Sequence, residues 1–223
     1  MIRALIFDMD GTLIDSEKMH YRAWRQTLQD FGVHSFPFED FVSYIGTSNE
    51  RLAGDYILSH GLAADIESLV LHKQKIYLEM IPEIKPLPGV REILSRYHGR
   101  LLLAVASSSH CLELSRILDT LELSSYFAYV VGGDMVSRKK PDPEIYLRTM
   151  ALLALRAEEC VAFEDSESGI AAAKNAGMFG VAVPNSLLTN GDFSRADAII
   201  RQIDQANDQL LENLASSRNL NAF

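Results

Sequence analysis

The stretch IRALIFDMDGTLI, residues 2–14, joins an apolar run to two carboxylates that lie at its end. Short continuous apolar runs such as Ala4–Phe7 are typical of strands in a parallel sheet covered on both faces. Asp8 and Asp10 follow at once, and Gly11 allows the strand to end there. Carboxylates crowded at a strand end repel one another, and a hard divalent cation such as Mg²⁺ relieves that repulsion. Capping of the following turn explains the same pattern, so this stretch alone leaves both interpretations open.

Similar apolar runs recur along the chain and alternate with helical patterns. They predict strands at 101–106, 128–131, 160–163, 180–183 and 198–200. Apolar residues at spacings of three and four predict helices at 90–97, 112–121, 143–153 and 168–176. This alternation predicts an α/β fold with a doubly wound parallel sheet, in which ligands bind at the carboxyl ends of the strands.

The segment between residues 15 and 86 departs from this alternation. It contains no clear strand pattern, but helical patterns recur at 20–31, 48–60 and 66–80. We therefore expect an all-helical cap domain at 16–85, inserted into a core domain formed by 1–15 and 86–223. The exit from the insertion is rich in proline, as a stiff connector would be. The polar end of the chain, SSRNLNAF, is expected to fray.

Composition restricts the classes of partner. A net charge of -9 and a pI near 5.1 argue against nucleic acid or an anionic membrane as the main partner, because both require a basic face. Two cysteines are too few for a disulfide framework and favour a reducing compartment. No apolar run approaches the roughly 18 residues of a membrane helix, and the first apolar segment is too short for a signal peptide. We expect a cytoplasmic protein, and no protein partner is implied.

Polar side chains also follow three of the other predicted strands. Ser107 and Ser108 follow the second strand, Lys140 lies in a loop after the third, and Glu164 and Asp165 end the fourth. Each feature has an ordinary explanation: a helix cap for the serines, a solvated charge for the lysine, and a cap for one of the acids. A doubly wound sheet, however, brings these strand ends to one edge. Acids, hydroxyls and a lysine gathered there form a complementary set that capping alone does not predict.

The four motifs DMDGT, ASS, KKPDP and FEDSESG occur in this order between Asp8 and Gly169. In this order the sequence closely resembles the haloacid dehalogenase superfamily, in the branch of small-molecule phosphatases and β-phosphoglucomutases with a helical cap. The resemblance extends over nearly the whole chain and includes the cap entry DSEKMHYRAW. It implies a Rossmann-like core and Mg²⁺-dependent phosphoryl transfer.

The resemblance assigns roles to the two acids of the first motif. Asp8 is the expected nucleophile, which attacks phosphorus and forms an aspartyl phosphate. Asp10 is expected to protonate the leaving oxygen and then deprotonate the attacking water, which requires a pKa raised toward neutrality. Dehalogenases and phosphonatases of the superfamily lack an acid at the position of Asp10, so their chemistry is not expected here.

The other motifs supply the expected metal and phosphate ligands. The resemblance implies that Mg²⁺ is held by the Asp8 carboxylate, the Asp10 backbone carbonyl and Asp165, with Glu164 assisting nearby. It also implies that the transferring phosphoryl oxygens are bound by Ser107, Ser108 and Lys140.

The predicted cap bears on the choice between hydrolysis and a mutase reaction. In β-phosphoglucomutases the loop that resembles YIGTSNERL carries basic residues immediately before its glycine and three positions after it. Here these positions are Ile45 and Asn49, although Arg51, Lys18 or Lys73 could compensate if the fold places them well. We therefore favour hydrolysis over a mutase. The expected substrate contacts are Glu17, His20, Asn49 and His110.

Two of the cap residues also have structural interpretations. In mutases a histidine at the position of His20 assists the gate between cap and core, but a structural role explains His20 as well, and a core role explains Trp24.

The preferred function is Mg²⁺-dependent hydrolysis of a small phosphorylated metabolite, a sugar or polyol monophosphate. A β-phosphoglucomutase-type sugar phosphate mutase is the alternative enzyme. A non-enzymatic protein that binds or senses phosphate and Mg²⁺, such as a phosphoreceiver domain, is the alternative of another class. Receivers lack a helical insertion, and all four motifs are intact here, which favours the enzyme.

Overall fold

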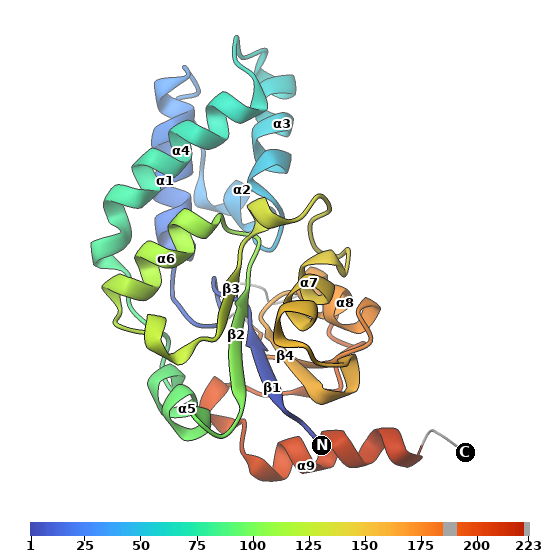
Figure 1. The fold of residues 1–223 in the computed structure, drawn as a ribbon. Helices are drawn as coiled ribbons and strands as arrows, with labels where there is room; N and C mark the ends of the chain where they lie inside the picture. Colours follow the sequence, from blue (N-terminus) through green and yellow to red (C-terminus); the bar gives the residue numbers. More distant parts are fainter. Residues whose placement is uncertain (185–190, 221–223) are drawn as a thin grey trace.

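The computed structural model describes residues 1–184 and 191–220. Its six strands are all parallel and form one sheet in the order β3-β2-β1-β4-β5-β6 (Figure 1). All six predicted strands are present, and the predicted α/β fold with a parallel sheet is confirmed. The strands are β1 (Ala4–Phe7), β2 (Leu102–Ala106), β3 (Tyr129–Val131), β4 (Cys160–Glu164), β5 (Phe179–Ala182) and β6 (Ala198–Ile199).

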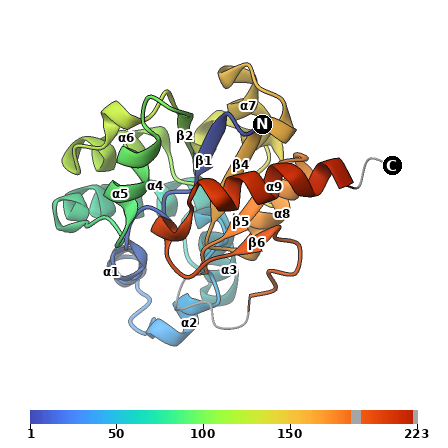
Figure 2. The ribbon, with the colours of Figure 1, turned by 90° about the horizontal axis from the view of Figure 1, so that it is seen from below.

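Helices cover both faces of the sheet. Alternate residues of a strand point to opposite sides, so each strand packs against helices on both faces. Leu5 and Phe7 pack in the cluster that contains α5 (Val90–Tyr97), α6 (Cys111–Thr120) and α9 (Asp208–Leu220). Ala4 and Ile6 pack in the cluster that contains α7 (Glu144–Leu153) and α8 (Glu167–Asn175). Figure 2, seen from below, shows α9 lying across one end of the sheet, opposite the helices formed by residues 17–80.

Between β1 and α5, the chain forms helices and no strand of the sheet. These helices are α1 (Glu17–Asp30), α2 (Phe38–Val42), α3 (Asn49–His60) and α4 (Ile66–Met80). They share a hydrophobic cluster of their own that includes Trp24, Phe36, Phe41 and Leu69. The helices lie above the sheet in Figure 1 and correspond to the expected cap. The domain limits, 16–85 for the cap and 1–15 with 86–223 for the core, stay a prediction, since Tyr77 of α4 packs with the core cluster.

Helices α2 and α9 are absent from the sequence prediction. Helix α2 was not predicted, because five residues are too few to show a helical period. The first five residues of SSRNLNAF continue α9 to Leu220, and the remaining three lie outside the described residues, so the expected fraying stays a prediction. Leu211 and Leu214 bury that helix against the core. Among the described residues, no helix is long and apolar enough to cross a membrane.

Candidate active site

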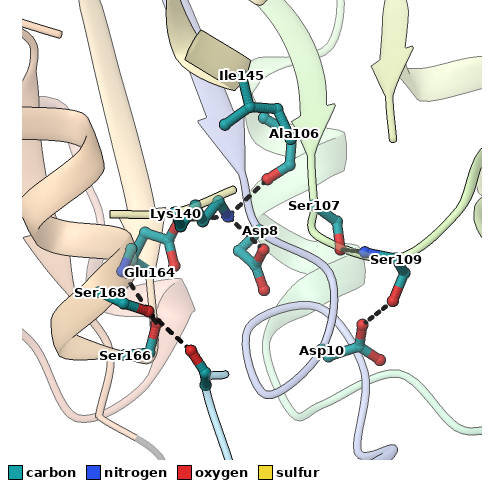
Figure 3. A network of polar contacts seen from close by, with 12 residues as sticks. Asp8, Asp10, Ala106, Ser107, Ser109, Lys140, Ile145, Glu164, Ser166 and Ser168 are labelled. Carbon is teal, nitrogen blue, oxygen red and sulfur yellow. Dashed lines mark hydrogen bonds and ion pairs between the residues drawn. The ribbon is translucent and has the colours of Figure 1, made fainter. Parts of the chain in front are cut away.

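The strand register places the polar strand ends side by side. Phe7 of β1 pairs with Val105 of β2 and with Phe163 of β4, so these three strands end at nearly the same level. Asp8 continues the ladder, and its backbone N–H donates to the carbonyl of Phe163 at 3.0 Å. The carboxyl ends therefore bring together side chains from separate parts of the chain, as the parallel topology requires (Figure 3). These side chains are Asp8, Ser107, Lys140, Glu164 and Asp165.

Lys140 lies at the centre of this group, and its side chain is 5% exposed. Its Nζ donates to Asp8 Oδ1 at 2.6 Å, to Glu164 Oε1 at 2.6 Å and to the carbonyl of Ala106 at 2.9 Å. An ammonium group has three N–H donors, so these contacts use all of them. The Tyr146 hydroxyl donates to the same Glu164 oxygen. Despite burial, the neighbouring carboxylates raise the pKa of Lys140, which is therefore charged and is no solvated surface lysine.

Three buried acids surround the end of β4 and form a cluster suited to a cation. Ligand oxygens of Asp8, Glu164 and Asp165 lie within 4.8 Å of one another. Burial, together with the nearby Glu164 and Asp10, raises the pKa of Asp8 to about 8 against the effect of Lys140. Burial and the charge of Asp8 raise the pKa of Asp165 well above its ordinary value. Three carboxylates beside one ammonium leave negative charge uncompensated, so the donor set fits a hard divalent cation such as Mg²⁺.

Glu164 is held where only glycine leaves room for its carboxylate. A Cβ atom on Gly169 would lie 1.8 Å from Glu164 Oε2. That oxygen is buried and accepts no hydrogen bond from any described residue. Glycine at position 169, in the first turn of α8, thus allows the acid to fill the space between Lys140 and the helix.

Asp10 belongs to a different set of contacts. Its carboxylate accepts hydrogen bonds from Ser16 Oγ at 2.6 Å, Ser109 Oγ at 2.7 Å and His20 Nε2 at 3.0 Å. Burial opposes ionisation of Asp10, but His20 and the two hydroxyls outweigh it and hold the pKa of this carboxyl well below its ordinary value. The expected rise of the Asp10 pKa is therefore wrong for this arrangement. Ser16 and Ser109 were not predicted as site residues, although Ser109 ends the polar run that follows β2.

Lys73 fixes the ring of His20 from the other side. Its Nζ lies 2.9 Å from His20 Nδ1, and an ammonium can only donate, so Nδ1 accepts and Nε2–H faces Asp10. Lys73 is fully buried, with Nζ 4.4 Å from the centre of the Tyr77 ring. Burial lowers the pKa of Lys73. Lys73 thus supports His20 and does not line the cavity between cap and core.

That cavity is bordered by core and cap residues together. Glu17, His20 and Asn49 line it from the cap, and Ser108 lines it from the core. Their contact with a substrate stays a prediction. The other lining residues of the cap include Trp24, Phe41, Tyr44, Ile45 and Leu52, which form an apolar wall.

His110 lies outside this lining. It directly precedes α6, where its backbone N–H donates to the Glu113 carboxylate, and its role as a substrate contact stays a prediction. Arg51 and Lys18 are exposed and do not line the cavity either. Within the described part of the chain, the cap therefore contributes no lysine or arginine to the lining.

The cap loop also touches the core directly. Ser168 Oγ donates to the carbonyl of Gly46 at 2.9 Å, and a Cβ atom on Gly46 would lie 3.1 Å from the Ser166 side chain. Figure 3 shows Ser166 and Ser168 close to Glu164. The loop that ends at α3 is thus seated on the first turn of α8, which closes one side of the cavity.

The fold and the site together define an α/β enzyme with a buried acidic centre beneath a helical cap. Residues 5–183 match the family described as haloacid dehalogenase-like hydrolase, so the chain belongs to this family. Named relatives within the family include phosphatases.

The chain is similar to relatives and solved structures over most of its length. A phosphorylated carbohydrates phosphatase from Thermotoga maritima is 39% identical over 183 residues, covering 79% of this chain and 82% of its own. A β-phosphoglucomutase from Bacillus subtilis is 31% identical over 227 residues, covering 94% of each chain. The crystal structure of CbbY from Rhodobacter sphaeroides in complex with phosphate has a TM-score of 0.85 at 26% identity, covering 92% of this chain and 96% of that one. The predicted family is therefore confirmed.

Proposed function

We propose that the enzyme hydrolyses the phosphate monoester of a small sugar or polyol and that Asp8 is its nucleophile. The observation that carries this proposal is the position of the Asp8 carboxylate, which lines the cap cavity and contacts the Lys140 ammonium at 2.6 Å. Attack of Asp8 on phosphorus would form an aspartyl phosphate, and water would then release inorganic phosphate, so one difficult displacement becomes two.

The acidic cluster is the proposed Mg²⁺ site. The carboxylates of Asp8 and Asp165 and the backbone carbonyl of Asp10 would hold the ion, with Glu164 nearby. When bound, Mg²⁺ screens the charge of the attacking carboxylate from that of the phosphate and orients both. Glu164 Oε1 accepts hydrogen bonds from both Lys140 and Tyr146, so its main proposed role is to hold the lysine in place.

The remaining core residues would position the phosphoryl group and move protons. Ser107 Oγ accepts the backbone N–H of Ser109 at 3.1 Å, which leaves its own hydrogen to donate to a phosphoryl oxygen. The three N–H donors of Lys140 already have protein acceptors, and one of these is the Asp8 carboxylate. The proposed role of Lys140 is therefore to neutralise charge at Asp8. Asp10, ionised in this arrangement, is in the form that accepts a proton from the attacking water. It would return a proton to the leaving oxygen in the other half-reaction.

The cap lining favours a neutral leaving group. Glu17, His20 and Asn49 offer polar contacts. Trp24 belongs to the apolar wall, which suits the C–H face of a sugar. No lysine or arginine of the described cap residues faces this space, so a second phosphate would lack a cation. The name of the Thermotoga relative, a phosphatase of phosphorylated carbohydrates, supports the same substrate class.

The β-phosphoglucomutase relative makes a mutase the second candidate. A mutase must hold a bisphosphate intermediate and exclude water, which calls for cations in the cap. The described cap residues of the lining provide no lysine or arginine, and hydrolysis is therefore the function we propose.

A screen for phosphate release tests the proposal. The enzyme is incubated with Mg²⁺ and a panel of sugar, polyol and nucleotide monophosphates, beside an assay of glucose 1-phosphate to glucose 6-phosphate conversion primed with bisphosphate. We expect release from sugar or polyol monophosphates that is lost with EDTA and in Asp8→Asn. Efficient interconversion without comparable hydrolysis would favour the mutase. Normal Mg²⁺ binding with neither activity would favour a binding protein.

A further inference from the structure

Trp24 makes a hydrogen bond whose direction can be decided from its chemistry. Its Nε1 lies 3.2 Å from Asn49 Oδ1, and the tryptophan side chain is buried in the cap cluster. An indole N–H can only donate. The oxygen of the Asn49 amide must therefore face the ring, since the opposite orientation would place two donors together and leave a buried N–H without an acceptor.

This contact determines what Asn49 presents elsewhere. Asn49 is the first residue of α3 and follows the N-cap Ser48, whose hydroxyl accepts from the backbone N–H of Arg51, so its backbone is fixed. With Oδ1 held by Trp24, the Nδ2 amide group is left as a donor. Among the described residues none accepts a hydrogen bond from Nδ2, and Asn49 borders the cavity that contains Asp8.

We propose that Asn49 Nδ2 donates a hydrogen bond to an uncharged oxygen of the leaving group and that Trp24 is a positioning residue that fixes the Asn49 amide. The inference rests on the proposed function and specifies how the cap selects the substrate.

A matching acceptor lies on the same wall of the cavity. Glu17, His20 and Trp24 are three and four residues apart on α1 and share one helix face, and all three line the cavity. Glu17 is 6% exposed, yet no described residue gives its carboxyl a hydrogen bond or an ion pair. A donor at Asn49 and an acceptor at Glu17 together suit hydroxyl groups, which both accept and donate. A carboxylate or a second phosphate would find no lysine or arginine among the described cap residues of the lining, so the structure assigns a neutral, polyhydroxylated leaving group.

A double-mutant cycle tests the role of Trp24. The measured quantity is kcat/KM for sorbitol 6-phosphate divided by kcat/KM for p-nitrophenyl phosphate, whose leaving group carries no second hydroxyl. We expect this ratio to fall about tenfold in Asn49→Ala and about tenfold in Trp24→Phe, which keeps a smaller aromatic ring and removes the N–H. If Trp24 acts through Asn49, the double variant falls no further than Asn49→Ala. A loss in the double variant equal to the product of the two single losses would overturn the positioning role.

A second variant tests the donor without touching the aromatic core. Asn49→Asp keeps an acceptor for the Trp24 N–H but removes the amide donor, so the ratio should fall at least as far as in Asn49→Ala. A ratio equal to that of the unmodified enzyme would overturn the proposal. This variant decides the question even if Trp24→Phe does not fold.

A binding measurement distinguishes failure of this inference from failure of the proposed function. In Asp8→Asn protein with Mg²⁺, calorimetry compares the affinities for sorbitol 6-phosphate and inorganic phosphate. We expect the sugar alcohol phosphate to bind more tightly and Asn49→Asp to remove about tenfold of that preference. No preference in the Asp8→Asn protein would overturn the inference, whether or not the unmodified enzyme hydrolyses the ester. Absence of hydrolysis of both esters, with the binding preference intact, would instead refute the proposed function.

Discussion

His20 Nε2 in the cap lies 3.0 Å from Asp10 Oδ1 in the core, and this contact couples the two parts of the molecule at the proposed proton-transfer residue. Lys73 holds the ring from its other nitrogen, and Tyr77 stacks against the ring with centroids 4.3 Å apart. Because His20 and Lys73 both belong to the cap segment, the orientation of Asp10 depends on how that segment sits over the sheet.

Replacing His20 with alanine is expected to lower kcat about 10- to 100-fold, because Asp10 loses a donor that orients its carboxylate. Steady-state kinetics on the best substrate of the screen provide the measurement. His72→Ala is the matched control, since His72 contacts Asp30 at 2.8 Å on the exposed side of the cap. Equal losses in the two variants would show that only general stability of the cap is affected.

Mg²⁺ should stabilise the folded enzyme through the acidic cluster. Ligand bound only to the folded state at 100 times its Kd contributes about 2.7 kcal/mol, so Tm should rise on addition of MgCl₂. Asp165→Asn removes one proposed ligand and should abolish most of the rise. Glu158→Gln, an exposed acid in the turn before β4, should keep it. A full rise in Asp165→Asn would place the ion elsewhere.

The sheet and the grouping of its polar ends could be predicted from sequence because each depends on a local pattern and one topological rule. Apolar runs identified the strands, and parallel pairing then brought Asp8, Lys140 and Glu164 to one edge. The strand register, which the sequence does not provide, determines which distant side chains come into contact. Ser109 Oγ reaches Asp10 across 99 positions of sequence, and no local pattern specifies such a contact.

Two residues considered from the sequence do not line the cavity. His110 follows the serines of the second motif, but the start of α6 places it outside the cavity lining. Lys73 was considered as a cation for a second phosphate, yet α4 packs on α1 and buries it against His20. Whether a charged side chain enters a cavity depends on helix rotation and packing, which a single sequence does not define.

Two helical glycines should respond in opposite ways to alanine. A Cβ atom on Gly169 would collide with the Glu164 carboxylate, so Gly169→Ala should displace that acid and lower both activity and stability, the latter by about 2 kcal/mol. In α3, a Cβ atom on Gly54 would meet only the Ile66 side chain at 3.5 Å, and Gly54→Ala should raise stability by about 0.5–1 kcal/mol. Denaturant unfolding and phosphate release measure both. Full activity in Gly169→Ala would mean that the position of Glu164 is not required.

Glu17 should make stability depend on pH. Burial, together with the charges of Asp10 and Asp8, raises the pKa of Glu17 to about 8 in the folded enzyme, against an ordinary value of 4.5. Between these values the folded enzyme keeps a proton that the unfolded chain has released, so stability is fully present below pH 4.5 and falls as pH rises toward 8. Glu17→Gln removes this titration and should gain about 4 kcal/mol relative to the unmodified enzyme between pH 5 and pH 8.5, measured by unfolding without Mg²⁺.

Glu79→Gln makes the same chemical change at an exposed position of α4, so its stability relative to the unmodified enzyme should hardly vary with pH. A Glu17→Gln difference that is equal at pH 5 and pH 8.5 would contradict the raised pKa. Repeating the measurement with Mg²⁺ should reduce the difference, because a cation bound near Asp8 offsets the negative charge that helps to keep Glu17 protonated. The same charge balance explains why a buried carboxyl without a protein donor can persist beside the site: it is tolerated as a protonated group until a substrate hydroxyl provides its partner.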